Sequence, residues 1–310
     1  MADKASSFLI IAICGVALTA ACPVAAEEAV APDLREAKKV FGAIKVPVKH
    51  PPQAIGQYDR GCIAGAQSLP VSGGSWQVMR LSRNRIWGHP LLVRYISKLA
   101  ADVHRLDGWS GILVGDMAQP IGGPLLGGHA SHQIGLDVDL WYKPMPPRAL
   151  SVDEREKLSA DNMVDPATLA VNMAVWTDAQ VNLLRRAASY PEVARIFVHP
   201  AVKKALCETA GADKGWLQKI RPWYKHDDHF HIRLNCPSDS PGCVPQAAIP
   251  PDDGCGQELD DWFKKLRAVP KKPTKPPEPA KPMLVSDLPK ECQSLLRATE
   301  QSVRGKAATN

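Results

Sequence analysis

Residues 127–141 read GGHASHQIGLDVDLW and residues 226–234 read HDDHFHIRL, and together they hold five of the nine histidines of the chain. Successive side chains of a β-strand point to opposite faces of the sheet. If residues 135–141 and 229–234 are strands, each has an apolar face that suits a core and a second face that is mostly polar. The polar faces carry acids and nitrogen bases: Asp137, Asp139, His229, His231 and Arg233. If the two strands are neighbours, these side chains meet at one site.

Neighbouring strands would bring Asp139, His229 and His231 together, and His132 lies on the loop just before the first strand. Two imidazoles and one carboxylate, with water in the fourth position, are the ligand set of a catalytic zinc ion. Such an ion polarises a scissile carbonyl and makes its water acidic, and a histidine outside the coordination shell can accept the water proton. An isolated His-x-His pair is more often a plain polar face. The prediction of a zinc site therefore depends on the two stretches occurring together.

The remaining polar residues of the two stretches have less defined roles. His129 is open to three interpretations: a partner of a ligand, a ligand of a second metal, or a loop histidine. Asp137 shares the ligand face and is placed to orient a ligand imidazole. Asp227 and Asp228 are predicted to be solvated loop acids. The other histidines are predicted to be structural or surface residues: His50, His89, His104 and His199.

Serine and cysteine nucleophiles have little support in the sequence. The chain has no G-x-S-x-G elbow, and its histidines cluster with one another rather than with a serine. Its composition is that of an ordinary globular protein, with 45% hydrophobic and 23% charged residues. The net charge of +6 comes largely from the proline-rich segment between Lys264 and Lys290. Because a nucleic-acid surface needs basic side chains clustered on a folded face, no nucleic-acid partner is expected.

The N-terminal residues 1–26 are predicted to be a signal peptide. Lys4 supplies a positive end, and Phe8 to Ala21 is an apolar run of signal-peptide length that is too short to span a membrane comfortably. Cleavage after Ala26 would release an exported chain with no membrane span. An alternative is a lipoprotein in which Cys22 is acylated.

Six cysteines remain after signal removal: Cys62, Cys207, Cys236, Cys243, Cys255 and Cys292. An even number in an exported chain indicates three disulfides, but spacing alone leaves all fifteen pairings open. Zinc ligation by these cysteines is not expected because the chain contains no C-x2-C pair.

Hydrophobic spacing predicts a fold of mixed helices and strands. Helices are predicted at 90–106, from Thr177 onward with Gln180 completing a capping box, and at 202–209. Strands are predicted at 112–114, 195–199 and 229–235. Because these elements lack regular β-α-β alternation, the fold class is α+β.

A change in composition divides the chain after the predicted catalytic domain. Residues 27–268 form the predicted zinc peptidase domain, and residues 269–287 form a proline-rich linker. Residues 288–310 form a C-terminal tail in which 288–296 is a short amphipathic segment tethered through Cys292. The residues from Val303 onward are expected to be disordered.

The spacing His132-x6-Asp139 followed by His229-Phe230-His231 resembles that of the LAS peptidases. Their zinc-binding fold is shared by lysostaphin-type enzymes, D-Ala-D-Ala carboxypeptidases and sonic-hedgehog-like domains. More closely, the chain resembles the penicillin-insensitive murein endopeptidase family over roughly residues 61–263. The resemblance rests on four further stretches: residues 76–85 (WQVMRLSRNR), 128–133 (GHASHQ), 195–198 (RIFV) and 221–223 (RPW).

The resemblance implies a central antiparallel sheet with flanking helices and a periplasmic enzyme that cleaves the D-alanyl–meso-diaminopimelyl cross-link of peptidoglycan. It implies zinc held by His132, Asp139 and His231, with His229 as the base and His226 assisting. It also implies resistance to penicillin, because no serine is acylated. The disulfides that it implies are Cys62–Cys292, Cys207–Cys255 and Cys236–Cys243.

The chain departs from the family pattern at one place. Some relatives bind further zinc through the counterpart of His129 together with an Asp and a His located before the counterpart of Trp176. This chain has Ala, Thr and Leu there and no histidine. The resemblance therefore gives little support to a second metal.

Two other functions remain as alternatives. A carboxypeptidase of the same fold, with D,D or L,D specificity, would trim a free peptide end rather than a cross-link. A non-enzymatic murein-binding regulator could keep a vestigial zinc, but the intact pair of motifs argues against it.

Overall fold

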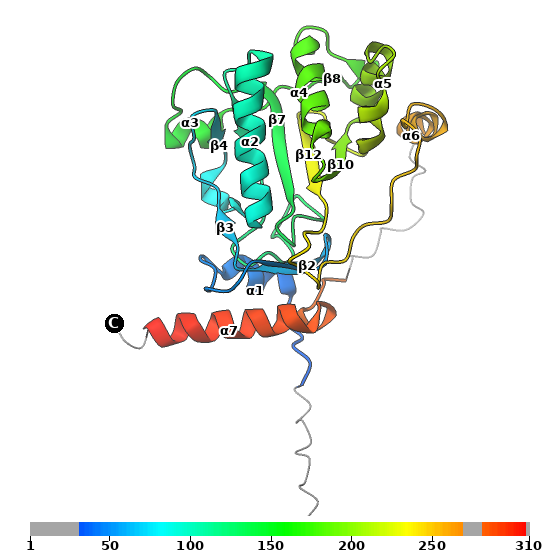
Figure 1. The fold of residues 1–310 in the computed structure, drawn as a ribbon. Coiled ribbons are helices and arrows are strands. Elements are labelled where there is room, and N and C mark those ends of the chain that lie inside the picture. Colours follow the sequence, from blue (N-terminus) through cyan, green and yellow to red (C-terminus); the bar gives the residue numbers. More distant parts are fainter. Residues whose placement is uncertain (1–30, 269–280, 308–310) are drawn as a thin grey trace, which may run out of the picture. The chain divides into compact units, whose positions relative to one another are not determined.

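The computed structural model describes residues 31–268 and 281–307, and a six-stranded sheet forms the centre of its main unit, residues 33–310. Figure 1 shows the sheet, whose strands run in the order β11-β10-β12-β7-β6-β4. Their bounds are β4 Trp76–Val78, β6 Ile112–Val114, β7 Asp137–Pro144, β10 Val193–Val198, β11 Ile220–Pro222 and β12 His229–Leu234. The predicted signal peptide, Cys22 and residues 269–280 of the predicted linker lie outside the described residues.

The sheet is mixed, which corrects the expectation of an antiparallel sheet. Its inner pairs, β10 with β12, β12 with β7 and β7 with β6, are antiparallel, whereas β11 pairs with β10 and β4 pairs with β6 in parallel. Parallel neighbours need a crossover connection, usually a helix. Helix α2, Pro90–Asp107, supplies it between β4 and β6, and α5, Pro200–Thr209, supplies it between β10 and β11. The fold class α+β is as expected.

The apolar faces predicted for the two central strands are buried in the main core. Leu136 precedes β7, and its alternating partners on β7 and β12 are all fully buried: Val138, Leu140, Phe230, Ile232 and Leu234. Helix α2 and helix α4, Asp178–Ser189, cover this face of the sheet (Figure 1). The opposite, polar faces of the same two strands are thereby directed away from these helices.

Side-chain caps fix the beginnings of these helices. Thr177 and Gln180 form the predicted capping box of α4. His89 caps α2 and His199 caps α5, in each case through a ring nitrogen that accepts a hydrogen bond from the second residue of the helix, with proline at the first position. His199 with its proline begins α5 two residues earlier than the predicted helix at 202–209. Both histidines are structural, as expected.

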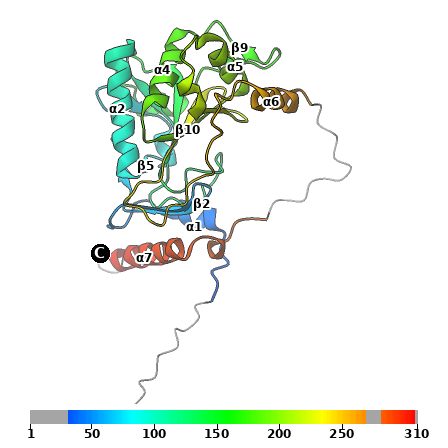
Figure 2. The same cartoon turned by 45° about the vertical axis from the view of Figure 1, so that its right-hand side comes forward.

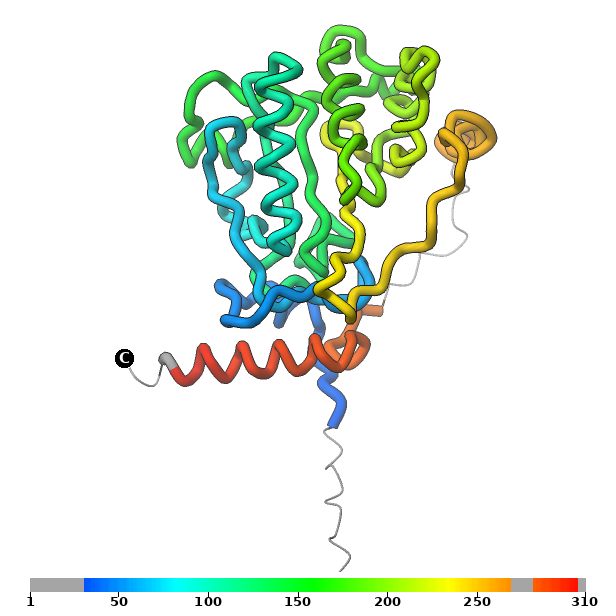
Figure 3. Tube along the Cα trace, viewed as in Figure 1, coloured from blue at the N-terminus to red at the C-terminus, as the bar shows by residue number. Residues whose placement is uncertain are grey.

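The N- and C-terminal parts of the described chain pack together around a second, smaller core (Figure 3). This core joins α1, Ala37–Ala43, the hairpin of β1, Gln53–Gln57, with β2, Arg60–Ala64, and helix α7, Lys290–Ala307. The backbone N–H of Ala37 donates to the carbonyl of Met283 at 2.9 Å. The composition of residues 281–287 predicted that they belong to the linker. In the structure they contain the 3-10 turn η3, Val285–Asp287, and Val285 is buried. Helix α7 also continues past the predicted segment 288–296 and the expected start of disorder.

The remaining elements are short. Two small antiparallel pairs are β3, Gln67–Ser68, with β5, Trp87–Gly88, and β8, Val164–Asp165, with β9, Ala170–Val171. Helix α3 spans Val152–Lys157, and two more 3-10 turns are η1, Leu81–Arg83, and η2, Gly215–Lys219. Helix α6, Gln257–Arg267, packs beside α5 (Figure 2). Within residues 31–268 and 281–307, no helix combines the length and apolarity needed to cross a membrane.

The described residues contain three disulfides: Cys62–Cys292, Cys207–Cys255 and Cys236–Cys243. They are the pairs that the family resemblance implies. The first ties α7 to β2, and the second ties α5 to the segment that leads into α6. The third closes a small loop just after β12.

Candidate metal centre

The pairing of β7 with β12 brings the two histidine-bearing stretches together. In the antiparallel register His231 stands opposite Asp139, Arg233 opposite Asp137, and His229 opposite Trp141. The loop before β7 then turns His132 toward the same face. This turn requires Gly135, which has φ +70° and approaches the chain so closely that a Cβ atom would lie 2.4 Å from Ile63 Cδ1 and 3.0 Å from the His89 backbone nitrogen.

The imidazoles of His132 and His231 both approach the same carboxylate oxygen of Asp139. Nε2 of His132 lies 3.4 Å from Asp139 Oδ1, and Nδ1 of His231 lies 3.2 Å from the same oxygen. The rings of His132 and His231 are 4.6 Å apart, centre to centre. All three side chains are buried.

Several polar atoms of these three residues have no hydrogen-bond partner among the described residues. Both ring nitrogens of His132, and Asp139 Oδ1, are buried without a hydrogen-bond partner in the described part of the chain. Burying a polar group without a partner costs on the order of 1–3 kcal/mol, so such groups call for a missing ligand. Two imidazoles and a carboxylate suit a zinc ion, so the residues present fit the metal that the sequence analysis predicts.

Asp137 holds this group in place from behind. Its carboxylate accepts a hydrogen bond from the backbone N–H of His132 at 3.0 Å and from Arg233 Nε at 2.8 Å, and it lies 3.0 Å from His231 Nε2. Burial alone would raise the pKa of Asp137, but Arg233 and His231 together hold it well below its usual range. Nε2 of His231 faces Asp137, and Nδ1 on the other side of the His231 ring therefore faces Asp139.

His129 lies at the same site and is held by a residue that the sequence reasoning missed. Its Nδ1 lies 3.4 Å from Asp139 Oδ2, and its Nε2 lies 2.9 Å from Asp116 Oδ2. In the described part of the chain, the potential ligand atoms of His129, His132 and Asp139 lie within 4.8 Å of one another. This group differs in one residue from the ligand set that the resemblance implies, because it contains His129 in place of His231. Arg83 and Arg85 also contact the buried Asp116 carboxylate. The one feature of the sequence that could have indicated a role for Asp116 is its position just after the predicted strand 112–114.

His229 lies at the edge of the group. Its Nδ1 donates to Asp228 Oδ1 at 2.6 Å, and its Nε2 lies 3.9 Å from Asp139 Oδ2. Burial would lower the pKa of His229, but Asp139 and Asp228 outweigh it and raise this pKa to about 9. Asp228 is therefore more than the solvated loop acid that the sequence suggested, because its contact fixes the ring of His229.

His226 lies beyond His229, in a turn where its own φ is +60°. Its ring centre is 5.1 Å from that of His229 and 6.0 Å from that of His231. Nδ1 donates to the carbonyl of Tyr224 at 2.7 Å. Burial, together with the positive fields of His231 and His229, lowers the pKa of His226 to about 3 and favours its neutral form.

A cavity of about 610 Å³ opens against these residues. His129, His226 and His231 line one part of it, and the remaining wall includes Phe197 and Arg233. A space of this volume is typical of a ligand site and can hold several residues of a peptide.

Comparisons with known proteins relate this chain to one family. Residues 54–297 match the family described as penicillin-insensitive murein endopeptidase. A protein of that name from Pectobacterium atrosepticum is 44% identical over 263 residues, which are 84% of this chain and 89% of the relative. One from Haemophilus influenzae is 45% identical over 232 residues, 73% and 79% of the two chains. One from Yersinia pestis is 44% identical over 252 residues, 81% and 87% of the two chains.

Asp137→Ala should destabilise the fold strongly, because it leaves the buried Arg233 without its carboxylate. Breaking a buried ion pair by removing one partner costs about 3–5 kcal/mol. Because the pKa of Asp137 is depressed in the folded chain, this contribution is present above the unfolded-state pKa of about 3.9 and is lost as the pH falls. Urea unfolding at pH 7 and at low pH measures the difference.

Asp153→Ala is the matched control, because Asp153 makes an exposed ion pair with Lys157 one turn further along α3. The control should change the free energy of unfolding far less than Asp137→Ala does. Equal losses in the two variants would contradict the positioning role of Asp137.

Proposed function

Because this chain belongs to the penicillin-insensitive murein endopeptidase family, we propose that it uses a zinc ion held by His132, Asp139 and His231 to hydrolyse the D-alanyl–meso-diaminopimelyl cross-link of peptidoglycan. The chain is a peptide hydrolase that acts on murein, as its family membership establishes. The observation that carries the proposal is that His132 Nε2 and Asp139 Oδ1 are buried without a hydrogen-bond partner in the described residues, with His231 Nδ1 3.2 Å from the same oxygen.

The proposed ligands are Nε2 of His132, Oδ1 of Asp139 and Nδ1 of His231, which the close approaches of these atoms favour. A bound zinc ion would polarise the scissile carbonyl and make a water molecule acidic. The Asp137 carboxylate lies 3.0 Å from Nε2 of His231, so the other nitrogen of this ring is directed toward Asp139 as a ligand. His129, held by Asp116, borders Asp139 on its other oxygen and limits how that carboxylate can rotate.

His229 is the proposed general base. Its Nδ1–H is committed to Asp228, and its Nε2 faces the ligand group. The Asp139 carboxylate is the largest cause of the raised pKa of His229, so a cation that neutralised Asp139 would lower this pKa and leave Nε2 with the lone pair of a base. A base in this position can take the proton of the attacking water and pass it to the leaving amine. His226, whose depressed pKa favours the neutral imidazole, can assist by accepting a hydrogen bond from the substrate or from water at the cavity edge.

The fold and the location of the protein follow from the same proposal. The sheet would be that of the LAS-type metallopeptidases, with the H-x-H pair on β12 beside the aspartate of β7. Murein lies outside the cytoplasm, so the enzyme acts there. Export through the signal peptide of residues 1–26 would deliver it to the periplasm, where the three disulfides are stable.

Purified sacculi test the proposed reaction directly. The zinc-loaded protein should remove cross-linked dimeric muropeptides and release tetrapeptide monomers, with or without penicillin. EDTA should abolish this conversion, added zinc should restore it, and Asp139→Ala should be inactive. Chromatographic muropeptide analysis measures all of these products.

Two results would replace the proposed reaction with another. Intact dimers with shortened free peptide ends would indicate a carboxypeptidase. Binding to sacculi without any change in their muropeptides would indicate a regulator.

His229→Ala tests the proposed base. The variant should bind zinc as the wild type does, because His229 is not a proposed ligand, but it should lose roughly 10²–10⁴-fold in kcat. Metal analysis and muropeptide kinetics measure the two quantities. His50→Ala, which removes an exposed histidine, should retain both. If His229→Ala kept a rate near that of the wild type, the role of base would pass to His226.

A further inference from the structure

A row of four aromatic side chains leads from the cavity to the surface of the protein. Phe197 on β10 contacts Trp223, with ring centres 5.7 Å apart. Trp223 and Tyr224, which follow β11, both pack on Trp262 of α6, with ring centres 5.5 Å and 4.5 Å away. Because Phe197, Trp223 and Tyr224 also line the cavity, the row continues the cavity wall outward.

The outer members of this row face solvent. Trp223 is 49% exposed and Tyr224 is 51% exposed, whereas Phe197 and Trp262 beneath them are each only 7% exposed. Adjacent large aromatic side chains that are exposed beside a cavity are typical of a binding site. Trp223 and Tyr224 are hereafter called the aromatic platform.

The backbone beneath the platform is firmly held. Arg221, two residues before Trp223, is buried and donates to Glu258 of α6 at 2.6 Å and to Asp252 at 3.1 Å. The backbone N–H of Trp223 donates to the carbonyl of Val198 at 2.8 Å. The platform and its support on α6 are thus joined by charge-assisted hydrogen bonds.

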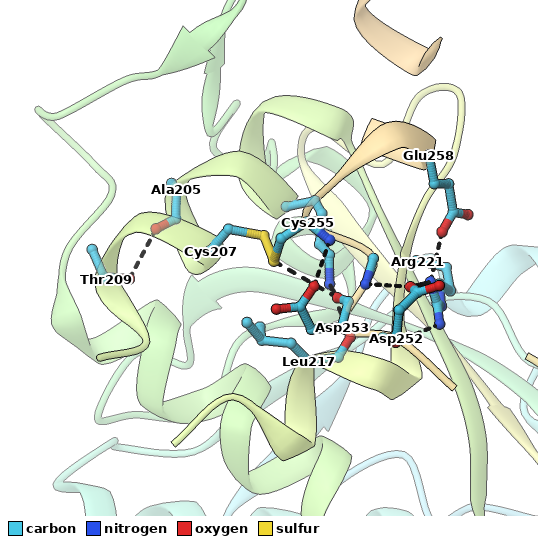
Figure 4. The surroundings of a disulfide bond; sticks show 11 residues. Ala205, Cys207, Thr209, Leu217, Arg221, Asp252, Asp253, Cys255 and Glu258 are labelled. Carbon is cyan, nitrogen blue, oxygen red and sulfur yellow. Dashed lines mark hydrogen bonds and ion pairs between the residues drawn. A yellow bond between two sulfur atoms is a disulfide. The ribbon is translucent and has the colours of Figure 1, made fainter. Parts of the chain in front are cut away.

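The second anchor is the disulfide Cys207–Cys255, which fixes the segment leading into α6 (Figure 4). Gly254 lies against Arg221 so closely that a Cβ atom there would be 2.6 Å from Arg221 Nη1. A surface built in this way needs little rearrangement when it binds, which lowers the entropy cost of association.

The chemistry of the platform suits a sugar ring. The faces of aromatic rings are electron-rich, so they attract the slightly positive C–H groups on the apolar face of a pyranose. The peptide cross-link of murein is attached to a glycan strand, so a peptide seated in the cavity brings N-acetylated sugars close to its rim. Lys225, the next residue along the chain, also lines the cavity and offers a hydrogen-bond donor to sugar oxygens.

We propose that Trp223 and Tyr224 form a sugar-binding subsite that holds the glycan strand of murein while the peptide occupies the cavity. The choice of a glycan rests on the proposed function, because it is the murein substrate that joins a peptide to a polysaccharide. The occupant is therefore a chain of N-acetylhexosamines, and the contact is made by stacking on the two exposed rings.

Binding of peptide-free glycan tests this subsite apart from hydrolysis. The probes are glycan strands freed of peptide by an amidase and the tetramer of N-acetylglucosamine, titrated by calorimetry into the full-length zinc-loaded protein. Trp223→Ala and Tyr224→Ala should each weaken binding roughly tenfold or more, because truncating an aromatic anchor costs this much in a contact surface. Trp223→Phe, which keeps a stacking face, should retain most of the affinity.

Trp216→Ala is the matched control, since Trp216 packs under Arg185 and is not part of the cavity wall. It should bind glycan as the wild type does. The proposal is overturned if the wild type binds neither probe, or if the alanine variants at 223 and 224 bind as tightly as the wild type. Cleavage of a cross-linked peptide that carries no sugar, measured in parallel, tests the proposed function independently of the subsite.

Discussion

Asp137 and Arg233 stand opposite each other on β7 and β12 and form a buried ion pair, with Nε of Arg233 2.8 Å from the carboxylate. This pair fixes the antiparallel register of the two strands. A shift of one residue would turn every side chain of a strand to the other face, so it would bury His231 and Asp139 in the apolar core and expose Ile232 and Val138. The site exists only in the register that pairs Asp137 with Arg233, and the helices over the opposite face stabilise the same register.

The electrostatics of the site follow from this arrangement. Asp137, Asp139 and Asp116 are buried carboxylates whose pKa values lie below their usual range in spite of burial, because of Arg233 and His231 for Asp137, His129 and Arg85 for Asp116, and His132 and His229 for Asp139. Asp137 and Asp116 have guanidinium partners, whereas Asp139 has none among the described residues. The ligand group is thus the place where a divalent cation would complete the local charge balance. Asp137 contacts His231 and Asp116 contacts His129, and each of these contacts orients one imidazole toward Asp139.

The local rules of sequence predicted much of this structure. Alternation placed the core and site faces of β7 and β12 correctly, and the capping box gave the start of α4. The parallel outer strands were not predicted, because strand partners depend on crossover connections that a local pattern does not contain. Asp116 was missed for a similar reason: it reaches His129 only through the folding of distant segments. The full length of α7 was missed because residues 301–305 of its second half are exposed and carry no apolar pattern that marks them as helical.

The central claim is that one cation binds where His132, Asp139 and His231 meet. Anomalous diffraction at the zinc edge, from crystals of the zinc-loaded protein, locates that cation directly. The account predicts a single strong peak about 2.0–2.2 Å from His132 Nε2, from an Asp139 oxygen and from His231 Nδ1. A peak bound by His129, His132 and Asp139 but not by His231, or no peak within reach of Asp139, would contradict it.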